Sequence, residues 1–390
     1  MWIPRIAEET LRRMARQFPA VLVTGPRQSG KTSLLRTRFP QAHYVSLDSP
    51  SLAESAKSNP TDFLQSLPRP AIIDEIQYAP SLFRSLKVEV DRDRQPGRFL
   101  LTGSQIFPLM QGVSESLAGR CGLLPLHTLS WTEAAAVSAG MKEEAFLFAG
   151  GFPELHAETG VERDFWYPAY VATYLERDVR NVLRIADLGT FNRFLQTCAL
   201  RTGQVLSYSD LARDVGVAPN TARSWLSILT AAGTVFLVEP YHRNRGKRLV
   251  KSPKIFMGDT GLAAYLAGFR SIADLMASPL AGHFWETHVA NQVWRHYAFR
   301  GMRPPLYYWR TPDGREVDLV LDEGGGMLSA IECKMKETPE MADTRGLTEL
   351  RRFYGEKAVR RTFIACRTRA RFVLPEKTVA ISVGQLDQEL

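Results

Sequence analysis

The pattern of apolar positions predicts an α/β protein in which a parallel sheet comes first. Short apolar runs alternate with helical patterns over roughly the first 150 residues, as in parallel α/β sheets. Three of these runs predict buried strands, at Ala20–Val23, Ala71–Ile73 and Phe99–Leu101. Parallel strands bring their carboxyl ends to one edge of a sheet, where ligands bind. We therefore expect a ligand site where these three strands end.

The first strand leads into a phosphate-binding loop. The residues after it read Gly25-Pro26-Arg27-Gln28-Ser29-Gly30-Lys31-Thr32-Ser33. In the G-x-x-x-x-G-K-[ST] pattern the glycines let backbone N–H groups point at phosphates, and the helix N-terminus adds a positive field. Lys31 is expected to reach the β- and γ-phosphates of ATP, and Thr32 to hold Mg²⁺. All nine residues are predicted cofactor contacts.

Polar residues follow the other two strands. Asp74 and Glu75 end the second strand, where the first acid is expected to hold Mg²⁺ through water and the second to polarise the attacking water. The third strand ends in Thr102-Gly103-Ser104-Gln105, and Ser104 is a candidate contact to the γ-phosphate or the water. A glycine turn beside a surface acid pair is the alternative, but strand–loop–helix context favours the ATP site.

The middle of the chain predicts helices and a winged helix-turn-helix. After the turn-rich residues 150–153, a helical pattern covers Phe165–Arg184. Ser209 is expected to cap the first helix of the motif, and Pro219–Ala231 forms the second. A strand at Thr234–Pro240 completes the motif. Near the start of the second helix, base edges would meet three polar side chains, Thr221, Arg223 and Ser224.

The segment that follows this motif is strongly basic. Residues 241–254 contain six Lys/Arg and no acid, namely Arg243, Arg245, Lys247, Arg248, Lys251 and Lys254. A wing of this charge suits contacts to DNA phosphates, which weaken as salt rises. A module that only packs within the protein or contacts another protein is the second interpretation.

The C-terminal third predicts a helix, three strands, a further helix and a strand. Apolar residues recur at helical spacing over Phe284–Trp294 and again over Leu347–Tyr354. The predicted strands are Leu306–Trp309, Glu316–Leu321, Ser329–Lys334 and Thr362–Ala365.

Two of these strands carry an acidic signature. Asp318 and Glu332-Cys333-Lys334 resemble the D…(D/E)-x-K pattern of the restriction-endonuclease-like, or PD-(D/E)XK-like, α/β fold, with Glu286 as an additional acid. The resemblance implies that Glu286, Asp318 and Glu332 hold Mg²⁺, which would activate water. Lys334 would lower the pKa of that water or neutralise developing charge. The alternatives are an ion pair of Asp318 and Lys334 on a structural sheet, and a degenerate fold that only binds DNA.

Length and composition indicate a soluble protein of several domains. A chain of 390 residues exceeds one ordinary core, and we expect domains at 1–155, 156–275 and 276–390. The net charge of +8 favours a polyanionic partner over a merely solvated basic surface. Four scattered cysteines argue against a disulfide scaffold and lack the spacing of a zinc site, and they suit a reducing cytoplasm. No apolar run approaches the ~18–20 residues that cross a bilayer.

Four stretches together resemble the prokaryotic AAA-type ATPases that carry a C-terminal DUF4143 region. They are GPRQSGKT, IIDEIQ, LTGSQ and SESLAGRCGLLPLHTLSWTE, and the resemblance covers essentially the whole chain. It implies an ATPase that assembles into a homo-oligomer or ring, in which an arginine from a neighbouring subunit completes the active site. Arg120 is the candidate for that role, and a structural arginine is the alternative. Gln105 stands where the family usually has serine.

These observations favour an ATP-dependent protein that processes or remodels DNA, including branched DNA, through a C-terminal DNA-binding or Mg²⁺-dependent nuclease module. A nucleotide-gated switch whose winged-helix and C-terminal domains bind proteins, without nuclease activity, is the alternative. A Mg²⁺ nuclease whose ATPase only regulates access is a third hypothesis.

Overall fold

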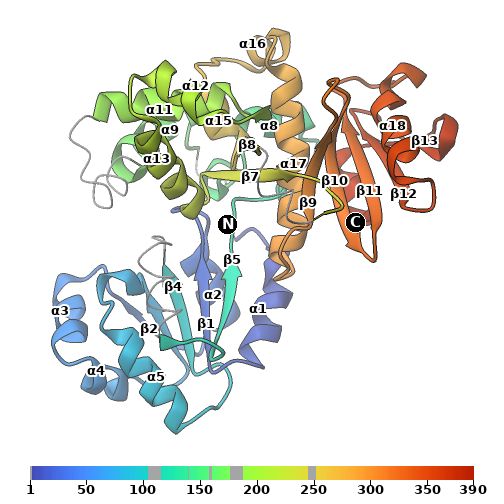
Figure 1. Ribbon diagram of the computed structural model, residues 1–390. Coiled ribbons are helices and arrows are strands. Elements are labelled where there is room, and N and C mark those ends of the chain that lie inside the picture. Colours follow the sequence, from blue (N-terminus) through green and yellow to red (C-terminus); the bar gives the residue numbers. More distant parts are fainter. Residues whose placement is uncertain (1, 104–115, 139, 158–159, 176–187, 245–251) are drawn as a thin grey trace.

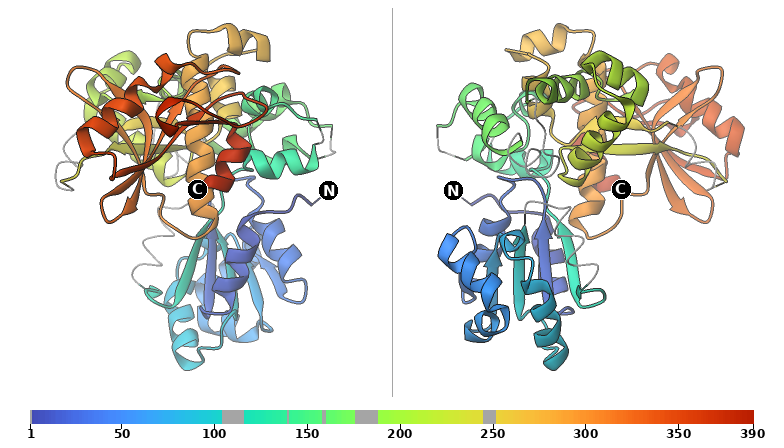
Figure 2. Two further views of the ribbon diagram at one scale, coloured as in Figure 1. Left: turned by 90° about the vertical axis from the view of Figure 1, so that its right-hand side faces the viewer. Right: turned by 60° about the vertical axis from the view of Figure 1, so that its left-hand side comes forward.

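The computed structural model describes residues 2–103, 116–138, 140–157, 160–175, 188–244 and 252–390. Figure 1 shows two lobes, with the first sheet and its helices set apart from the rest of the chain, and Figure 2 shows the same division from two other sides. The long helix α17 (Ala281–Phe299) belongs to the second lobe, but Phe299 at its end packs into the core of the first with Leu11 and Leu126. Among the described residues, no helix is both long and apolar enough to cross a membrane.

The first lobe is a five-stranded parallel sheet in the order β2-β3-β4-β1-β5. Its strands are β1 (Ala20–Thr24), β2 (His43–Ser46), β3 (Ala71–Asp74), β4 (Phe99–Gly103) and β5 (Cys121–Pro125). The three predicted strands are β1, β3 and β4. Their residues are buried throughout, because helices cover both faces of a parallel sheet and demand continuous apolar runs. Strand β4 separates β1 from β3, and this order decides which side chains meet at the ligand edge.

Helices cover both faces of this sheet. They are α1 (Ala7–Ala15), α2 (Lys31–Arg38), α3 (Pro50–Ser58), α4 (Pro60–Ser66), the 3₁₀ turn η1 (Ile76–Tyr78) and α5 (Leu82–Arg92). Helix α1 is amphipathic: it buries Ala7 and Leu11 and exposes its arginines. Full burial of a leucine of this kind stabilises the fold by about 1.5–3 kcal/mol.

The second lobe begins with helices, most of which pack into one large core. They are α7 (Trp131–Val137), α8 (Glu143–Ala149), η2 (Pro153–Leu155), α9 (Arg163–Tyr170), the π-helical turn η3 (Val171–Leu175), α11 (Leu188–Leu200), α15 (Thr260–Leu266) and α16 (Ile272–Ala277). Helix α7 packs instead into a smaller cluster with Phe146 of α8. The helical prediction over 165–184 corresponds to α9 and η3. Its remainder, residues 176–184, lies outside the described residues.

The predicted two-helix motif is present. Helix α12 (Tyr208–Val215) and helix α13 (Pro219–Ala231) are joined by a turn in which Gly216 adopts a left-handed φ of 79°. The predicted cap was wrong by two residues: the side chain of Ser207, not Ser209, accepts from the backbone N–H of Asp210. Strands β6 (Gln204–Val205), β7 (Val235–Pro240) and β8 (Lys254–Met257) flank this pair of helices in an antiparallel ladder.

The C-terminal third has the predicted order of helix, three strands, helix and strand. After α17 come β9 (Leu306–Arg310), β10 (Glu316–Gly324), β11 (Met327–Cys333), η4 (Met341–Thr344), α18 (Arg345–Tyr354), β12 (Val359–Ala365), β13 (Phe372–Val373), η5 (Pro375–Lys377), β14 (Val379–Ile381) and α19 (Val383–Glu389). Strands β9, β10 and β11 are antiparallel, whereas β11, β12 and β14 are parallel.

One sheet unites the two halves of the second lobe. Its nine strands run in the order β13-β14-β12-β11-β10-β9-β7-β8-β6. The junction is the parallel pairing of Glu239 with Tyr307 and of Pro240 with Tyr308. The sheet therefore continues across the boundary expected near residue 275, and β8 lies within reach of α17 and β10.

Candidate functional site

The phosphate-binding loop lies between β1 and α2, as predicted. A Cβ at Gly25 would come within 2.1 Å of the carbonyl oxygen of Leu126, so this close approach requires glycine. Gly30 caps α2 with a φ of 91°, which favours glycine for a second reason. The Nζ of Lys31 donates to the carbonyl oxygens of Gly25 at 3.1 Å and Pro26 at 2.8 Å. The ammonium is therefore held inside the curl of the loop.

Three strands bring their polar ends together beside this loop. The Thr32 hydroxyl donates to Asp74 Oδ1 at 2.7 Å, which places the predicted metal-holding pair in direct contact. Tyr44, from β2, donates to Asp74 Oδ2 at 2.9 Å. Burial, followed by this hydrogen bond, raises the pKa of Tyr44 above its usual value. Both oxygens of Asp74 are thus oriented.

Thr102, at the end of the intervening strand β4, connects the two acids. Its hydroxyl donates to Asp74 Oδ1 and accepts from the backbone N–H of Glu75 at 3.0 Å. Glu75 adopts a left-handed backbone (φ 55°), and the Gln77 amide donates to its Oε2. The position of Glu75, the predicted water-polarising base, is therefore set by Thr102 and Gln77. Ser104 and Gln105 lie outside the described residues.

A cavity of about 310 Å³ opens over this edge. It is lined by Arg27, Gln28, Gly30, Lys31, Thr32, Ser33, Asp48, Glu75, Pro153 and Glu154. Ser29 is fully buried, and its hydroxyl has no hydrogen-bond partner within the described ranges. A triphosphate would supply that partner, and Thr32 with Asp74 would hold its Mg²⁺. The residues thus fit ATP with Mg²⁺, which would supply charge neutralisation at the transferring phosphoryl group.

Arg5 contacts the phosphate loop, which nothing in the sequence indicated. It is 5% exposed, and its guanidinium donates to the carbonyl oxygens of Ser29 at 2.8 Å and His127 at 2.7 Å. Its Nε pairs with Glu133, which is also buried, at 3.1 Å. The phosphate loop is therefore fastened to the start of the second lobe through one arginine.

Arg120, the candidate trans arginine, lies far from the phosphate loop of its own chain. It immediately precedes β5, next to the amino-terminal end of β1, whereas the loop follows the carboxyl end of β1. Its guanidinium donates to both carboxylate oxygens of Asp91, at 2.6 and 2.9 Å. Any role in a second subunit would require this ion pair to open or to be shared.

The exposed face of α13 is polar and carries no acid. Asn220, Arg223, Ser224 and Ser227 are exposed on it, and the Arg223 guanidinium lies 4.9 Å from the centroid of the Tyr208 ring. Arg243 is also exposed. Four predicted wing residues, Arg245, Lys247, Arg248 and Lys251, lie outside the described residues.

Lys254 corrects the prediction that it contacts DNA phosphates. It is only 2% exposed, because it begins β8 in the interior of the nine-stranded sheet. Its Nζ donates to Glu286 Oε1 at 2.7 Å, pairs with Glu316, and lies 3.9 Å from Asp318 Oδ1. Burial alone would lower the pKa of Lys254, but the carboxylates, Glu286 first, outweigh burial and raise that pKa above its usual value. Lys254 therefore stays charged.

The acids around Lys254 form a group that we name the C-terminal carboxylate cluster: Glu286, Glu316, Asp318 and Glu332. Lys334 pairs with Glu332 Oε1 at 2.7 Å, rather than with Asp318. Asp318 Oδ2 accepts from the backbone N–H of Cys333 at 2.7 Å. Burial, followed by the charge of Asp318, raises the pKa of Glu332 to about 8.

This cluster does not fit the Mg²⁺ site implied by the sequence resemblance. Over the described part of the chain, no group of three or more His, Cys, Asp or Glu side chains is arranged to hold a metal ion. The physical reason is that the Lys254 ammonium lies among Glu286, Glu316 and Asp318. An ammonium and a divalent cation would compete for the same carboxylate oxygens, so Lys254 leaves no room for Mg²⁺ among them.

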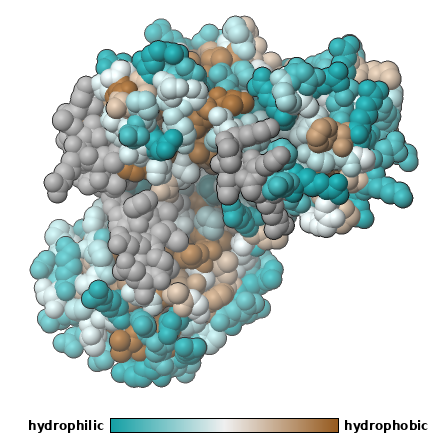
Figure 3. All heavy atoms as spheres, in the orientation of Figure 1, coloured by the Kyte–Doolittle hydropathy of each residue, from teal (hydrophilic) through white to brown (hydrophobic). Residues whose placement is uncertain are grey.

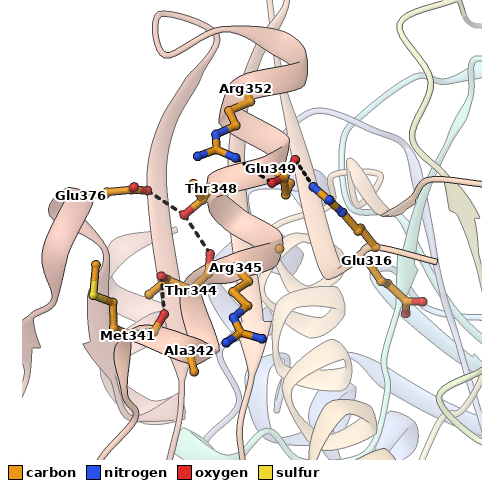
Figure 4. A pocket seen from close by; sticks show the side chains of 11 residues that line it. Glu316, Met341, Ala342, Thr344, Arg345, Thr348, Glu349, Arg352 and Glu376 are labelled. Carbon is orange, nitrogen blue, oxygen red and sulfur yellow. Dashed lines mark hydrogen bonds and ion pairs between the residues drawn. The ribbon is translucent and has the colours of Figure 1, made fainter. Parts of the chain in front are cut away.

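The cavity beside this cluster is balanced in charge. About 810 Å³ in volume, it is lined by Glu316 and by residues of η4, α18 and η5 (Figure 4). Glu349 pairs with Arg315 at 2.5 Å and with Arg352 at 2.9 Å. Figure 3 shows that the second lobe is mostly hydrophilic around the C-terminal strands on the face in view. Because its acidic and basic side chains balance, the cavity lacks the net positive charge that would attract phosphates.

Comparison with solved structures gives only distant likenesses. The Walker-type ATPase PABY2304 of Pyrococcus abyssi is 16% identical, with a TM-score of 0.46 over 67% of this chain and 94% of that chain. RuvB of Thermotoga maritima, in a form with one substitution, is 22% identical, with a TM-score of 0.30 over 63% of this chain and 92% of that chain. The family assignment rests instead on sequence.

Three family models match consecutive parts of the chain. An AAA domain matches residues 17–135, and two domains of unknown function, DUF8612 and DUF4143, match residues 142–273 and 281–386. The uncharacterized proteins Rv2008c of Mycobacterium tuberculosis and Mb2031c of Mycobacterium bovis are each 34% identical over 98% of this chain and 84% of their own length. The chain therefore belongs to the family of these two mycobacterial proteins, and it is an AAA-type ATPase with a C-terminal DUF4143 domain.

Proposed function

We propose that this protein is a DNA-binding ATPase in which ATP at the phosphate loop controls how a winged helix holds DNA. The observation that carries the proposal is the proximity of Pro26 and Gly233. A Cβ at Gly233 would lie 3.5 Å from Cδ and Cγ of Pro26, so the turn after α13 lies next to the phosphate loop. The helix with the exposed polar face is thus the one that adjoins the ATP site.

The contacts of Lys31 indicate how the phosphate loop and helix α13 would communicate. Lys31 holds the carbonyl oxygens of Gly25 and Pro26, and it must give up part of that hydrogen bonding to reach a phosphate. A shift of Pro26 would press on Gly233, where α13 ends. Because a packed helix moves as a unit, the polar face at its other end would tilt relative to DNA.

Charge supports DNA as the partner. The chain carries a net charge of +8, and residues 241–254 contain six Lys/Arg without an acid. Although Lys254 is withdrawn into the interior, Arg243 is exposed beside the sheet, and α13 adds Arg223. We propose that the C-terminal domain, with a fold like that of restriction endonucleases, binds DNA or braces the wing and does not cut. The cluster neutralised by Lys254 favours a domain that does not cut, and the cavity balanced in charge favours bracing over DNA binding at that cavity.

Two further features belong to the proposal. Thr32 and Asp74 would hold Mg²⁺, Lys31 would neutralise the γ-phosphate, and Glu75 would polarise the attacking water. Assembly into a homo-oligomer would bring Arg120 of one subunit to the ATP of the next. Sedimentation with and without ATP would test assembly, and Arg120→Ala should then lower turnover at unchanged ATP affinity.

The central experiment measures DNA affinity and ATP turnover together. Fluorescence anisotropy with single-stranded, duplex and branched DNA, at low and at physiological salt, should show binding that weakens with salt. Arg223→Ala should weaken the best binder by about 1–3 kcal/mol, which is roughly five-fold or more. The matched control is Arg94→Ala, an exposed arginine on the first lobe. Lys31→Ala serves as the blank for turnover.

The outcomes separate the two functional classes. ATP turnover stimulated by one DNA form, with an affinity that changes on adding ATP, would support the proposal. Turnover indifferent to every DNA, with no retention of DNA at low salt, would refute it and favour a switch that acts on protein partners.

A further inference from the structure

The buried ammonium of Lys254 joins three elements of the second lobe. Lys254 belongs to β8, where its backbone pairs with Val238 of β7 and Val205 of β6. Its side chain reaches Glu286 on α17, and Glu316 and Asp318 on β10. The lysine side chain is 3% exposed and that of Glu286 is 8% exposed, so bulk water does not screen this contact.

A buried charge of this kind persists only when it is paired. Removing an ammonium or a carboxylate from water is costly, and the cost is offset only by good geometry with opposite charges. Lys254 has one carboxylate oxygen of Glu286 at 2.7 Å, a second ion pair with Glu316, and Asp318 at 3.9 Å. These are the acids that a metal ion would need, and the same cluster leaves Glu332 Oε2 buried without a hydrogen-bond partner among the described residues.

We propose that Lys254 is an internal cation that takes the place of a divalent metal ion in the C-terminal carboxylate cluster. The cluster then fastens the β7–β8 pair to α17 and β10, and it is closed to Mg²⁺ while Lys254 is in place. Withdrawal of the lysine exposes an acidic site that accepts a divalent cation. This inference does not depend on DNA binding.

The arrangement gives the cluster a place in the mechanics of the fold. Lys254 ends the basic segment 241–254. The two residues before it are also fastened, because the Ser252 carbonyl accepts from the Tyr308 hydroxyl and the Pro253 carbonyl accepts from the backbone N–H of Leu206. Glu286 lies on α17, and Glu316 begins β10 of the C-terminal sheet. The cluster therefore joins the β7–β8 pair to the C-terminal domain at a second place, in addition to the pairing of β7 with β9.

The test is Mn²⁺ binding without nucleotide, measured by titration calorimetry and by thermal melting. All proteins carry Asp74→Asn, so that the ATP site does not contribute a metal ligand. The protein with Lys254 intact should show no saturable Mn²⁺ binding and no change in melting temperature with Mn²⁺. Lys254→Met should melt several degrees lower, bind Mn²⁺, and recover most of the loss in millimolar Mn²⁺.

Two controls keep the result specific. Lys254→Arg keeps the cation and should behave like the protein with Lys254 in showing no Mn²⁺ dependence. Adding Asp318→Asn to Lys254→Met should abolish the recovery by Mn²⁺. If Lys254→Met does not fold, Lys254→Gln, which keeps an N–H donor for Glu286, allows the same comparison.

The proposal is overturned by either of two results. One is Mn²⁺ binding that is equal with and without Lys254 and that is lost on Asp318→Asn, since the site would then be open already. The other is a folded Lys254→Met or Lys254→Gln protein that neither binds nor is stabilised by Mn²⁺.

Discussion

Arg5 and Arg295 bind two consecutive residues of the segment after β5. Arg5 donates to the carbonyl oxygen of His127 at 2.7 Å, and Arg295 donates to the hydroxyl of Thr128 at 2.5 Å. Arg5 also holds Ser29 of the phosphate loop, and Arg295 lies 4.0 Å from Asp259, which caps α15. A continuous series of buried polar contacts thus leads from the ATP site into the second lobe.

Arg5→Lys should weaken ATP binding more than it slows turnover. Lysine keeps the charge opposite Glu133 but cannot donate to three acceptors in the planar fork of a guanidinium. The Ser29 carbonyl would lose its partner, and the loop would no longer be held in its binding shape. We expect KM for ATP to rise several-fold with kcat nearly unchanged, measured in a steady-state ATPase assay.

The matched control for Arg5 is Arg98→Lys. Arg98 lies in the same lobe and also donates to two carbonyl oxygens, those of Glu89 at 3.1 Å and Asp93 at 2.7 Å, away from the loop. Arg98→Lys should lower the melting temperature of the protein slightly and leave KM for ATP unchanged. Equal KM values in both variants and the parent protein would show that Arg5 is merely structural.

Thr102→Val should slow hydrolysis without weakening ATP binding. Valine has the shape of threonine but cannot donate to Asp74 or accept from the backbone N–H of Glu75. A displacement of about 1 Å at a catalytic group costs up to ~100-fold in rate, so we expect kcat to fall ~10- to 100-fold. Thr102→Ser keeps the hydroxyl and should restore most of the rate. A Thr102→Val enzyme with full kcat would exclude this positioning role.

Gly233→Ala should alter the ATP site from the far side of the domain junction. Gly233 has a φ of 70°, and a Cβ there would make van der Waals contact with Pro26 at 3.5 Å. A non-glycine residue in this conformation costs about 1–2 kcal/mol of stability. Because Pro26 belongs to the phosphate loop, we also expect a change in KM for ATP and a smaller effect of ATP on DNA affinity.

Gly216→Ala separates the two effects of that change. Gly216 has a similar φ of 79° at the end of α12, but nothing lies within 4 Å of a Cβ there. It should lose a similar amount of stability in denaturant unfolding and leave KM for ATP unaltered. If Gly233→Ala and Gly216→Ala change KM for ATP alike, the change does not pass from the turn after α13 to the phosphate loop through Pro26.

The ATP site was predictable because its chemistry is local in sequence. Residues 25–33 form an uninterrupted motif, and the apolar runs before Asp74 and Thr102 identify the strands that carry them. Parallel strands then place these ends at one edge without further information. The predicted cap of α12 was wrong although a cap is also a local feature. Ser207 and Ser209 both precede apolar helical positions, and only the backbone geometry shows that Ser207 is the cap.

The contacts that cross the fold could not be predicted in this way. Arg5 has no local signal, because its partner Glu133 lies 128 residues away. The charge of Lys254 resembled that of its basic neighbours, whereas its partner Glu286 lies on a helix that is buried almost throughout. An acid within such an apolar helix requires a buried partner, and the apolar run after Lys254 was the one available indication of which lysine that is.

His127 and His288 should make the protein less stable in acid. Burial lowers the pKa of His127 and of His288 to about 3, with nearby Arg295 adding to the effect in both. In the unfolded chain each would take up a proton near its ordinary pKa of about 6.5. Between those values the unfolded state binds more protons, so the folding free energy contributed by these groups is lost as pH falls below about 6.5. Each histidine adds a slope of up to about 1.4 kcal/mol per pH unit.

His288→Leu isolates one of these two contributions. Neither ring nitrogen of His288 has a hydrogen-bond partner within the described residues, and the ring packs 5.6 Å from the centroids of Phe146 and Trp285. Leucine therefore removes a titrating group from an apolar site without leaving a donor or an acceptor unsatisfied. Melting curves at pH 5 and pH 7.5 should show a smaller loss of stability on acidification than the parent protein shows. The exposed His43, replaced by Gln, should leave the loss unchanged. A His288→Leu protein with the full parental loss would mean that His288 already accepts a proton in the folded state, and that its site is open to water.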